Sequence, residues 1–177
     1  MKFVFALTVA ALGAAYGYAG DLELGDVKAS VPKEWKEEKP SSSMRLTQFR
    51  LPKADGDSAD AELVVFYFRT DSGTVEANLK RQADKFKPAE GKDKVETKVE
   101  KVKIGSVEAT YQDLTGTMLI KKAPFDPKSE TVEKTNYRQL YVIYKTEKGD
   151  YYLQLFGPAK TVEKHKKDFD AVLKSFK

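Results

Sequence analysis

The chain has 177 residues, of which 41% are hydrophobic and 33% are charged, a length and composition typical of one folded domain. Its net charge of +4 combines 31 basic with 27 acidic side chains, so the charge balance does not indicate a nucleic-acid-binding protein. Cysteine is absent and His165 is the one histidine, which excludes disulfides, thiolate catalysis, thiolate metal sites and sites built from two histidines.

Residues 1–19 have the pattern of a cleaved secretory signal peptide. Lys2 provides a positive start, a mostly apolar run follows, and the small residues Gly17 and Ala19 occupy the positions that a signal peptidase reads. The apolar run, about thirteen residues, is too short to cross the hydrocarbon core of a bilayer. We therefore expect residues 20–177 to form a single exported domain, periplasmic or extracellular, with no stable membrane insertion. A retained N-terminal anchor is the alternative.

Most of the expected domain has the sequence pattern of β-strands. Residues 44–51 largely alternate apolar and polar side chains, which is typical of a half-buried antiparallel strand. Residues 61–68 are almost continuously apolar, which indicates a strand near the centre of a sheet. The expected strands cover residues 27–31, 44–51, 61–68, 94–103, 107–120, with a bulge at Asp113 or Gly116, 136–146 and 150–156, and the longer loops cover residues 36–43, 52–60 and 121–134.

Two segments have helical spacing. In the first, Val75, Leu79, Ala83 and Phe86 form one apolar stripe over about three turns. The second begins near Thr161, which we expect to cap it. Its apolar face comprises Val162, His165, Phe169, Val172 or Leu173, and Phe176. The pattern predicts an α+β domain in which two helices cover a mostly antiparallel sheet of six or seven strands.

The order of these elements resembles the PsbP-like fold. The first expected strand ends in Val31-Pro32 ahead of Trp35, and the last helix ends in Leu173-Lys-Ser-Phe176. Residues 41–49 and 157–167 also resemble segments of uncharacterised bacterial secreted proteins. The PsbP-like family includes the extrinsic photosystem II subunit, a Ran-binding eukaryotic relative, and exported or lipid-anchored bacterial proteins. The resemblance implies a fold for nearly the whole exported domain and a tendency to act by binding a larger partner. It implies no site residue.

The loop at residues 121–134 is the segment that we expect to bind a partner. The residues expected to make the contact are Lys121, Lys122, Phe125 and Asp126, and a proline stands on each side of the Phe-Asp pair. Because prolines restrict the loop, an aromatic side chain presented there loses little entropy on docking. Aromatic residues beside basic ones are also common at interface hot spots. The alternative is that Phe125 folds back over the edge of the sheet.

Two polar features have simpler structural interpretations. Asp55, Asp57 and Asp60 have a spacing that can present oxygens to calcium, but the loop lacks the glycine and glutamate of an EF-hand. An ordinary polar turn is therefore expected, and weak cation binding stays open. His165 is flanked by lysines, which disfavour its cationic form, so we expect a packed histidine rather than a catalytic base.

Two further sets of residues are expected to serve packing and solvation. The basic outer side of the last helix is interrupted by acids and is expected to be a solvated face, with contact to an acidic partner or anionic lipid as the alternative. It comprises Lys164, Lys166, Lys167, Lys174 and Lys177. The tyrosines of the final hairpin are expected to contact one another across the strands and to pack under a helix. They are Tyr137, Tyr141, Tyr144, Tyr151 and Tyr152.

No catalytic motif is present: the sequence has neither a Gly-x-Ser-x-Gly elbow nor a phosphate-binding glycine loop. We therefore expect an exported, non-catalytic binding or accessory protein, with an unidentified protein partner in the cell envelope. No cofactor, metal or nucleic acid is expected. The alternative is a carrier that holds an apolar or anionic small molecule between the sheet and a helix, under the tyrosine-rich hairpin. An enzyme of unrecognised type would need a pocket with acids of perturbed pKa.

Overall fold

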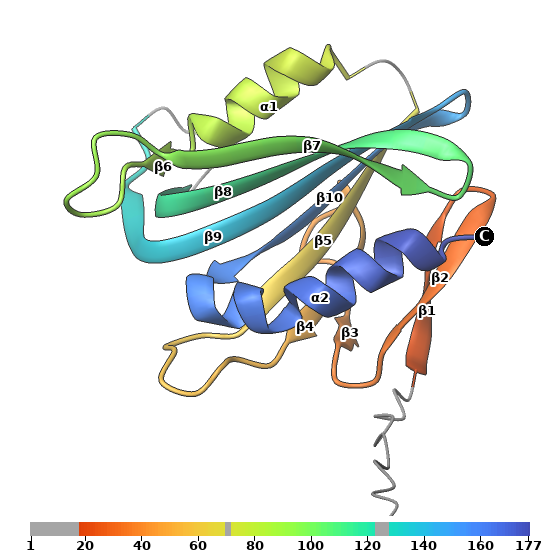
Figure 1. The fold of residues 1–177 in the computed structure, drawn as a ribbon, viewed down its shortest axis with the longest axis horizontal. Coiled ribbons are helices and arrows are strands. Elements are labelled where there is room, and N and C mark those ends of the chain that lie inside the picture. Colours follow the sequence, from red (N-terminus) through yellow and green to blue (C-terminus); the bar gives the residue numbers. More distant parts are fainter. Residues whose placement is uncertain (1–17, 70–71, 123–127) are drawn as a thin grey trace, which may run out of the picture.

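A computed structural model describes residues 18–69, 72–122 and 128–177, and these residues form ten strands and two helices (Figure 1). The strands are β1 (Tyr18–Leu24), β2 (Val27–Pro32), β3 (Lys36–Glu38), β4 (Arg45–Leu51), β5 (Ala61–Phe68), β6 (Phe86–Lys87), β7 (Glu96–Ile104), β8 (Val107–Lys121), β9 (Thr131–Thr146) and β10 (Gly149–Pro158). The helices are α1 (Val75–Ala83) and α2 (Ala159–Ser175). The α+β prediction is confirmed.

Eight strands form one antiparallel sheet in the order β3-β4-β5-β10-β9-β8-β6, with β7 also paired to β8. The first two strands form a separate antiparallel hairpin. As the apolar run of β5 predicted, that strand lies inside the sheet, between β4 and β10. The sheet is larger than predicted because β3 and β6 have three and two residues, too few to show a periodic pattern.

Strand β9 begins five residues earlier than predicted, at Thr131, and its first residues pair with β8. The expected loop at residues 121–134 is therefore shorter. Lys121 is the last residue of β8, and Thr131 already pairs with it at the start of β9. The start of β9 is mostly exposed on both faces, so alternation gave no signal there. The pairing of β8 with β9 shifts register between Gly116 and Met118, next to one of the two predicted positions, but the extra residue lies on β9 rather than on β8.

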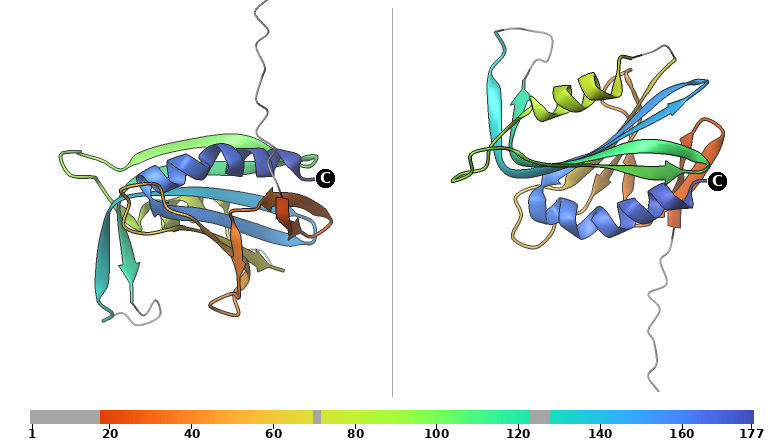
Figure 2. Two further views of the ribbon diagram at one scale, coloured as in Figure 1. Left: turned by 90° about the horizontal axis from the view of Figure 1, so that it is seen from below. Right: turned by 45° about the horizontal axis from the view of Figure 1, so that its top comes forward.

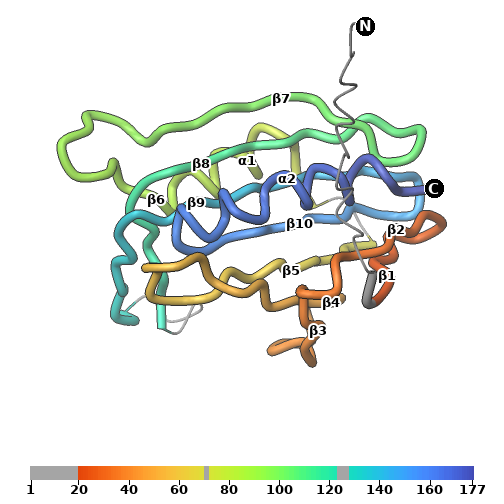
Figure 3. The backbone as a smooth tube through the Cα atoms, turned by 60° about the horizontal axis from the view of Figure 1, so that its bottom comes forward, coloured from red at the N-terminus to blue at the C-terminus, as the bar shows by residue number. Residues whose placement is uncertain are grey.

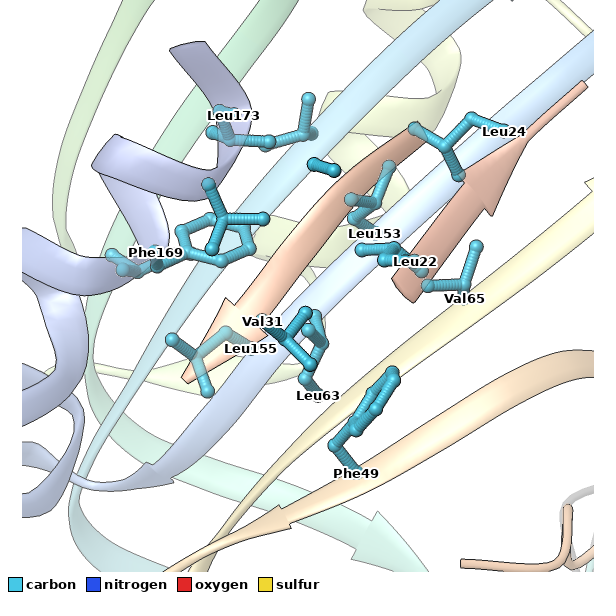
Figure 4. Close-up of a cluster of buried hydrophobic side chains, with 14 of the residues drawn as sticks. Leu22, Leu24, Val31, Phe49, Leu63, Val65, Leu153, Leu155, Phe169 and Leu173 are labelled. Carbon is cyan, nitrogen blue, oxygen red and sulfur yellow. The ribbon is translucent and has the colours of Figure 1, made fainter. Parts of the chain in front are cut away.

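The main hydrophobic core lies between the sheet and α2, with the β1–β2 hairpin closing one end (Figures 1 and 4). Phe169 and Leu173 of α2 face Leu155 and Leu153 of β10, and Trp35 is also buried in this core. Every residue predicted on the apolar face of the last helix is buried, His165 among them. The prediction of a packed histidine is confirmed.

The second helix begins differently from the prediction. It starts at Ala159, and its own N-cap, Pro158, makes no side-chain hydrogen bond. Instead, Asp57 Oδ2 accepts hydrogen bonds from the backbone N–H of Thr161 at 2.8 Å and from its hydroxyl at 2.7 Å. Thr161 is therefore capped by the neighbouring loop, a long-range contact that local spacing cannot predict.

The first helix covers the opposite face of the sheet from α2 (Figure 2). Its apolar stripe was predicted to run through Phe86, but the helix ends at Ala83 and Phe86 belongs to β6. The buried residues of α1 are the polar Asn78 and Gln82, while Val75 and Leu79 are partly buried. These two apolar residues pack against a small cluster in the sheet, made of Tyr141, Ile143, Tyr152 and Phe66. A helix this short covers only part of the face.

Candidate functional site

A groove of about 850 Å³ lies on the part of this face that α1 leaves uncovered. The end of the β8–β9 hairpin and the connection between β3 and β4 both project to the same side of the sheet and flank the groove (Figures 2 and 3). Residues from five strands, one helix and two connecting segments line it. They are Ser41, Ser42, Met44, Arg45, Val64, Phe66, Arg81, Asp84, Lys85, Met118, Leu119, Ile120, Lys121, Thr131, Gln154 and Phe156.

The floor of the groove is mainly apolar. Val64 and Phe66 come from β5, Phe156 from β10, and Met118 and Ile120 from β8. Because side chains alternate between the two faces of a strand, the residues from β5 and β10 point away from the α2 core, which takes Leu63, Val65 and Leu155 from the same strands. The two central strands therefore present apolar side chains on both faces, and on this face α1 covers only some of them.

Four cationic side chains stand around this floor. Arg45 forms an ion pair with Glu62, with 3.3 Å between Nη1 and Oε2. Arg81 and Lys85 extend from α1 and the residues just after it, and Lys121 lies at the end of β8. Among the described lining residues, Asp84 is the one carboxylate, and it is paired with Lys80 of α1 at 2.7 Å. The groove thus combines an apolar floor with a cationic rim.

The cation of Lys85 is held by amides rather than by a carboxylate. Its Nζ donates to Oε1 of Gln82 at 2.8 Å, and Arg81 donates to Oδ1 of Asn78 at 2.6 Å. Burial lowers the pKa of Lys85, and the nearby positive charge of Arg81 lowers it further. An anionic group bound beside these two side chains would stabilise the ammonium form and offset both effects.

The structure connects part of the predicted contact surface with this groove. Lys121 lines it, and both Lys121 and Lys122 are exposed at the end of β8. Lys122 pairs with Glu130 across the hairpin at 2.7 Å. The other two residues of the predicted surface, Phe125 and Asp126, lie outside the described residues.

The groove residues on β5 and α1 were not predicted from the sequence. The continuous apolar run in residues 61–68 was the available signal, because a strand that is apolar on both faces needs cover on both. The tyrosines behave as predicted: Tyr144 pairs with Tyr151 across the hairpin, and Tyr141 stacks on Tyr152 with ring centroids 6.0 Å apart. Since α1 already packs on Tyr141 and Tyr152, the groove lies beside these tyrosines rather than under them.

The acidic loop of residues 52–60 is the polar turn expected from its sequence. Asp60 Oδ1 accepts a hydrogen bond from the backbone N–H of Lys53 at 2.9 Å, and Asp57 caps the start of α2. Within the described part of the chain, Asp55, Asp57 and Asp60 do not come together as a group of metal ligands.

Comparisons with known proteins bear on the fold. No family model matches the chain, and no curated protein matches it. Among solved structures, LpqN, involved in cell envelope biogenesis of Mycobacterium tuberculosis, is 15% identical over 89% of this chain and 88% of its own, with a TM-score of 0.50. Cyanobacterial PsbP from Synechocystis is 16% identical over 96% of both chains, with a TM-score of 0.49.

Neither helix in the described residues is long and apolar enough to cross a bilayer. The similarity to LpqN shows that the chain shares the fold of a bacterial envelope protein. The order of the elements agrees with the PsbP-like resemblance of the sequence.

Proposed function

We propose that this chain is a non-catalytic binding protein whose groove holds the apolar chain of an anionic amphiphile, a molecule such as a fatty acid. The observation that carries the proposal is the combination of an apolar floor and a cationic rim in one groove of about 850 Å³. A volume of this size falls within the usual range for small-molecule sites, which are mostly apolar with a few polar groups that fix orientation.

The charges around the groove favour an anionic head group over a neutral or cationic one. Arg81, Lys85 and Lys121 all line the groove, and its one described carboxylate, Asp84, is paired with Lys80. An acyl chain lying over the floor would remove exposed apolar surface from water, at about 25 cal/mol for each Å² buried. The head group would then lie at the end where Arg81 and Lys85 emerge from α1.

The chemistry of the lining residues supports a binding role rather than catalysis. Within the described lining there is no histidine, and no carboxylate pair of the kind that hydrolases use. We further propose export and an accessory role in the cell envelope, on the basis of the signal-like segment at residues 1–19. The similar fold of LpqN, a protein involved in cell envelope biogenesis, agrees with that setting.

A second candidate function is contact with a protein partner through the end of the β8–β9 hairpin. The exposed positions of Lys121 and Lys122 beside the groove favour it. Affinity capture from an envelope extract tests this candidate, with Phe125→Ala as the comparison bait. A partner held by the unmodified chain and lost from the variant is the expected result. A partner held equally by both baits would contradict this surface.

Calorimetric titration with decanoate tests the main proposal, and decyltrimethylammonium is the probe of opposite charge. We expect decanoate to bind and the cationic probe to bind at least about tenfold more weakly, a difference of about 1.4 kcal/mol. Met44→Glu places a negative charge on the rim, so we expect it to weaken decanoate binding by a similar factor.

Val99→Glu is the matched control, because Val99 on β7 is 50% exposed, as Met44 is 49% exposed, and Val99 lies outside the groove. It should leave the affinity for decanoate unchanged. Equal binding of both probes, or equal loss in both variants, would contradict the proposal.

A further inference from the structure

A second cluster of side chains that can bind a metal lies where α2 packs against the turn after β2, away from the groove. His165 and Asp168 are three residues apart on α2 and therefore on one side of the helix. Glu34 comes from the tight turn after β2, which is closed by a hydrogen bond from Trp35 N–H to Pro32 O at 3.0 Å. One ligand atom from each of these three side chains lies within 4.8 Å of the other two.

The hydrogen bond of His165 fixes which ring nitrogen carries the proton. Nε2 lies 2.8 Å from the carbonyl oxygen of Pro52. A carbonyl oxygen can only accept, so Nε2 is the donor and the neutral ring has its lone pair on Nδ1. The side chain is fully buried, and among the described residues Nδ1 has no hydrogen-bond partner.

The Nδ1 lone pair can therefore accept a hydrogen bond or bind a cation. Its nearest carboxylate oxygen, Glu34 Oε1, is 3.9 Å away, beyond hydrogen-bond distance. A buried polar atom without a hydrogen-bond partner costs about 1–3 kcal/mol of stability. An atom of this kind in a folded protein therefore indicates a bound ion, water or ligand. A cation placed between the nitrogen lone pair and the two carboxylates would satisfy all three groups.

We infer that Glu34, His165 and Asp168 form a binding site for a divalent transition metal, with Zn²⁺ as the ion that fits the donor set best. One imidazole nitrogen and two carboxylate oxygens suit Zn²⁺, whereas Ca²⁺ takes oxygen ligands. A histidine that binds a metal usually donates its other ring N–H to a backbone carbonyl or carboxylate, and His165 already does so to Pro52.

The surroundings permit the small movement that coordination requires. Zn²⁺ takes nitrogen and oxygen ligands at about 2.0–2.2 Å, so the carboxylates must close slightly around the ion. Glu34 is free to do this because its side chain is half exposed. Asp168 is partly exposed and borders a depression of about 160 Å³ between α2 and β2, so its carboxylate also has space to move. The edge contact of Trp35 with the imidazole holds the ring in place.

Nearby lysines do not block the position. Lys164 donates to the backbone oxygens of Pro52 and Lys53, at 3.3 and 3.2 Å. Lys167 lines the same depression as Asp168, and the two carboxylates of the site offset its charge. The inference is independent of the groove and of the function proposed for it.

Calorimetric titration of the full chain with Zn²⁺ tests the site. We expect one Zn²⁺ to bind. Loss of even an outer partner of a metal ligand costs about ten- to a hundredfold in affinity, so Glu34→Gln or Asp168→Asn, which each remove a proposed ligand, should weaken binding by at least about tenfold. Both are partly exposed and should leave the melting temperature of the metal-free protein nearly unchanged. Glu23→Gln, the same change at an exposed position on β1, is the matched control and should bind as the unmodified chain does.

Nuclear magnetic resonance of the imidazole gives a second readout that needs no substitution. With a single histidine in the chain, all imidazole nitrogen signals belong to His165. We expect Zn²⁺ to shift Nδ1 strongly while the Nε2 proton is retained. Unchanged imidazole signals at saturating Zn²⁺, or equal affinity in the Glu34→Gln, Asp168→Asn and Glu23→Gln variants, would overturn the inference.

Discussion

Single polar contacts attach α2 to the loop of residues 52–60. Asp57 accepts two hydrogen bonds from Thr161 in the first turn of the helix, where backbone N–H groups have no partner within the helix. We expect Asp57→Ala to lower the free energy of unfolding by about 1 kcal/mol, as for other lost caps, measured by urea denaturation. Asp55→Ala, an exposed aspartate in the same loop, should change it by less than about 0.5 kcal/mol. Equal effects would contradict the capping role.

Gly116 allows two strands to approach each other closely. A Cβ atom there would lie far inside van der Waals contact of the carbonyl oxygen of Lys87 on β6. We expect Gly116→Ala to lower the free energy of unfolding by about 1–3 kcal/mol, because the backbone must shift. Gly20→Ala has open space around the added methyl group and should be close to neutral. A stable Gly116→Ala variant with unchanged chemical shifts in β6 would contradict this close packing.

At the scale of elements, one arginine joins β8, β9 and α2. Arg138 on β9 donates from Nε and Nη2 to both carboxylate oxygens of Asp113 on β8, at 2.8 and 2.6 Å, and its Nη1 contacts Glu163 on α2. The hydrogen bonds that Arg138 donates to Asp113 are the main cause that raises the pKa of Arg138. Burial opposes them, and the negative charges of Asp113 and Glu163 raise the pKa further. The guanidinium therefore remains charged.

We expect Asp113→Asn to lower the free energy of unfolding by roughly 2 kcal/mol, because it leaves a mostly buried guanidinium without its main counter-charge. Glu163 is mostly exposed, so Glu163→Gln should cost less than about 1 kcal/mol. Thermal or urea denaturation of the two variants measures the difference. A larger loss of unfolding free energy in Glu163→Gln than in Asp113→Asn would contradict the expectation that the buried Arg138–Asp113 pair contributes more than the exposed Arg138–Glu163 pair.

The elements that could be predicted are those with a clear apolar pattern of their own. The apolar face of α2 and the continuous apolar run of β5 have such a pattern, and both were predicted close to their true positions. The start of β9 is exposed on both faces, so its pairing arises from the register of its neighbours rather than from its own pattern. The buried face of α1 is polar, with Asn78 and Gln82, so an apolar stripe could not locate its end.

The candidate sites depend on contacts between distant segments, so the sequence pointed to them only in part. Lys121 was predicted as a contact residue and lines the groove, but its neighbours there come from β5, β10 and α1. Glu34 meets His165 and Asp168 through the packing of the turn after β2 against α2. No local spacing links Glu34 to the two residues on α2, which explains why no metal site was predicted.

For the molecule as a whole, buried tyrosines determine how it responds to alkali. Burial raises the pKa of Tyr111, Tyr141, Tyr144 and Tyr151 above the ordinary value near 10. Because these pKa values are higher in the folded chain than in the unfolded chain, the buried neutral tyrosines contribute to the free energy of unfolding. That contribution is complete below about pH 10 and is lost as the pH rises further. We expect tyrosinate absorption and loss of circular dichroism to appear together above pH 10. Complete tyrosine titration near pH 10 in a folded chain would contradict this.

Methionine methyl signals test most directly whether the groove on the α1 face binds the chain of an anionic amphiphile. The chain has three methionines, and two of them, Met44 and Met118, line the groove. Decanoate added to protein labelled with ¹³C at the methionine methyl groups should shift both signals and give contacts from its methylene protons. Saturating decanoate that leaves Met44 and Met118 unmoved would contradict the account.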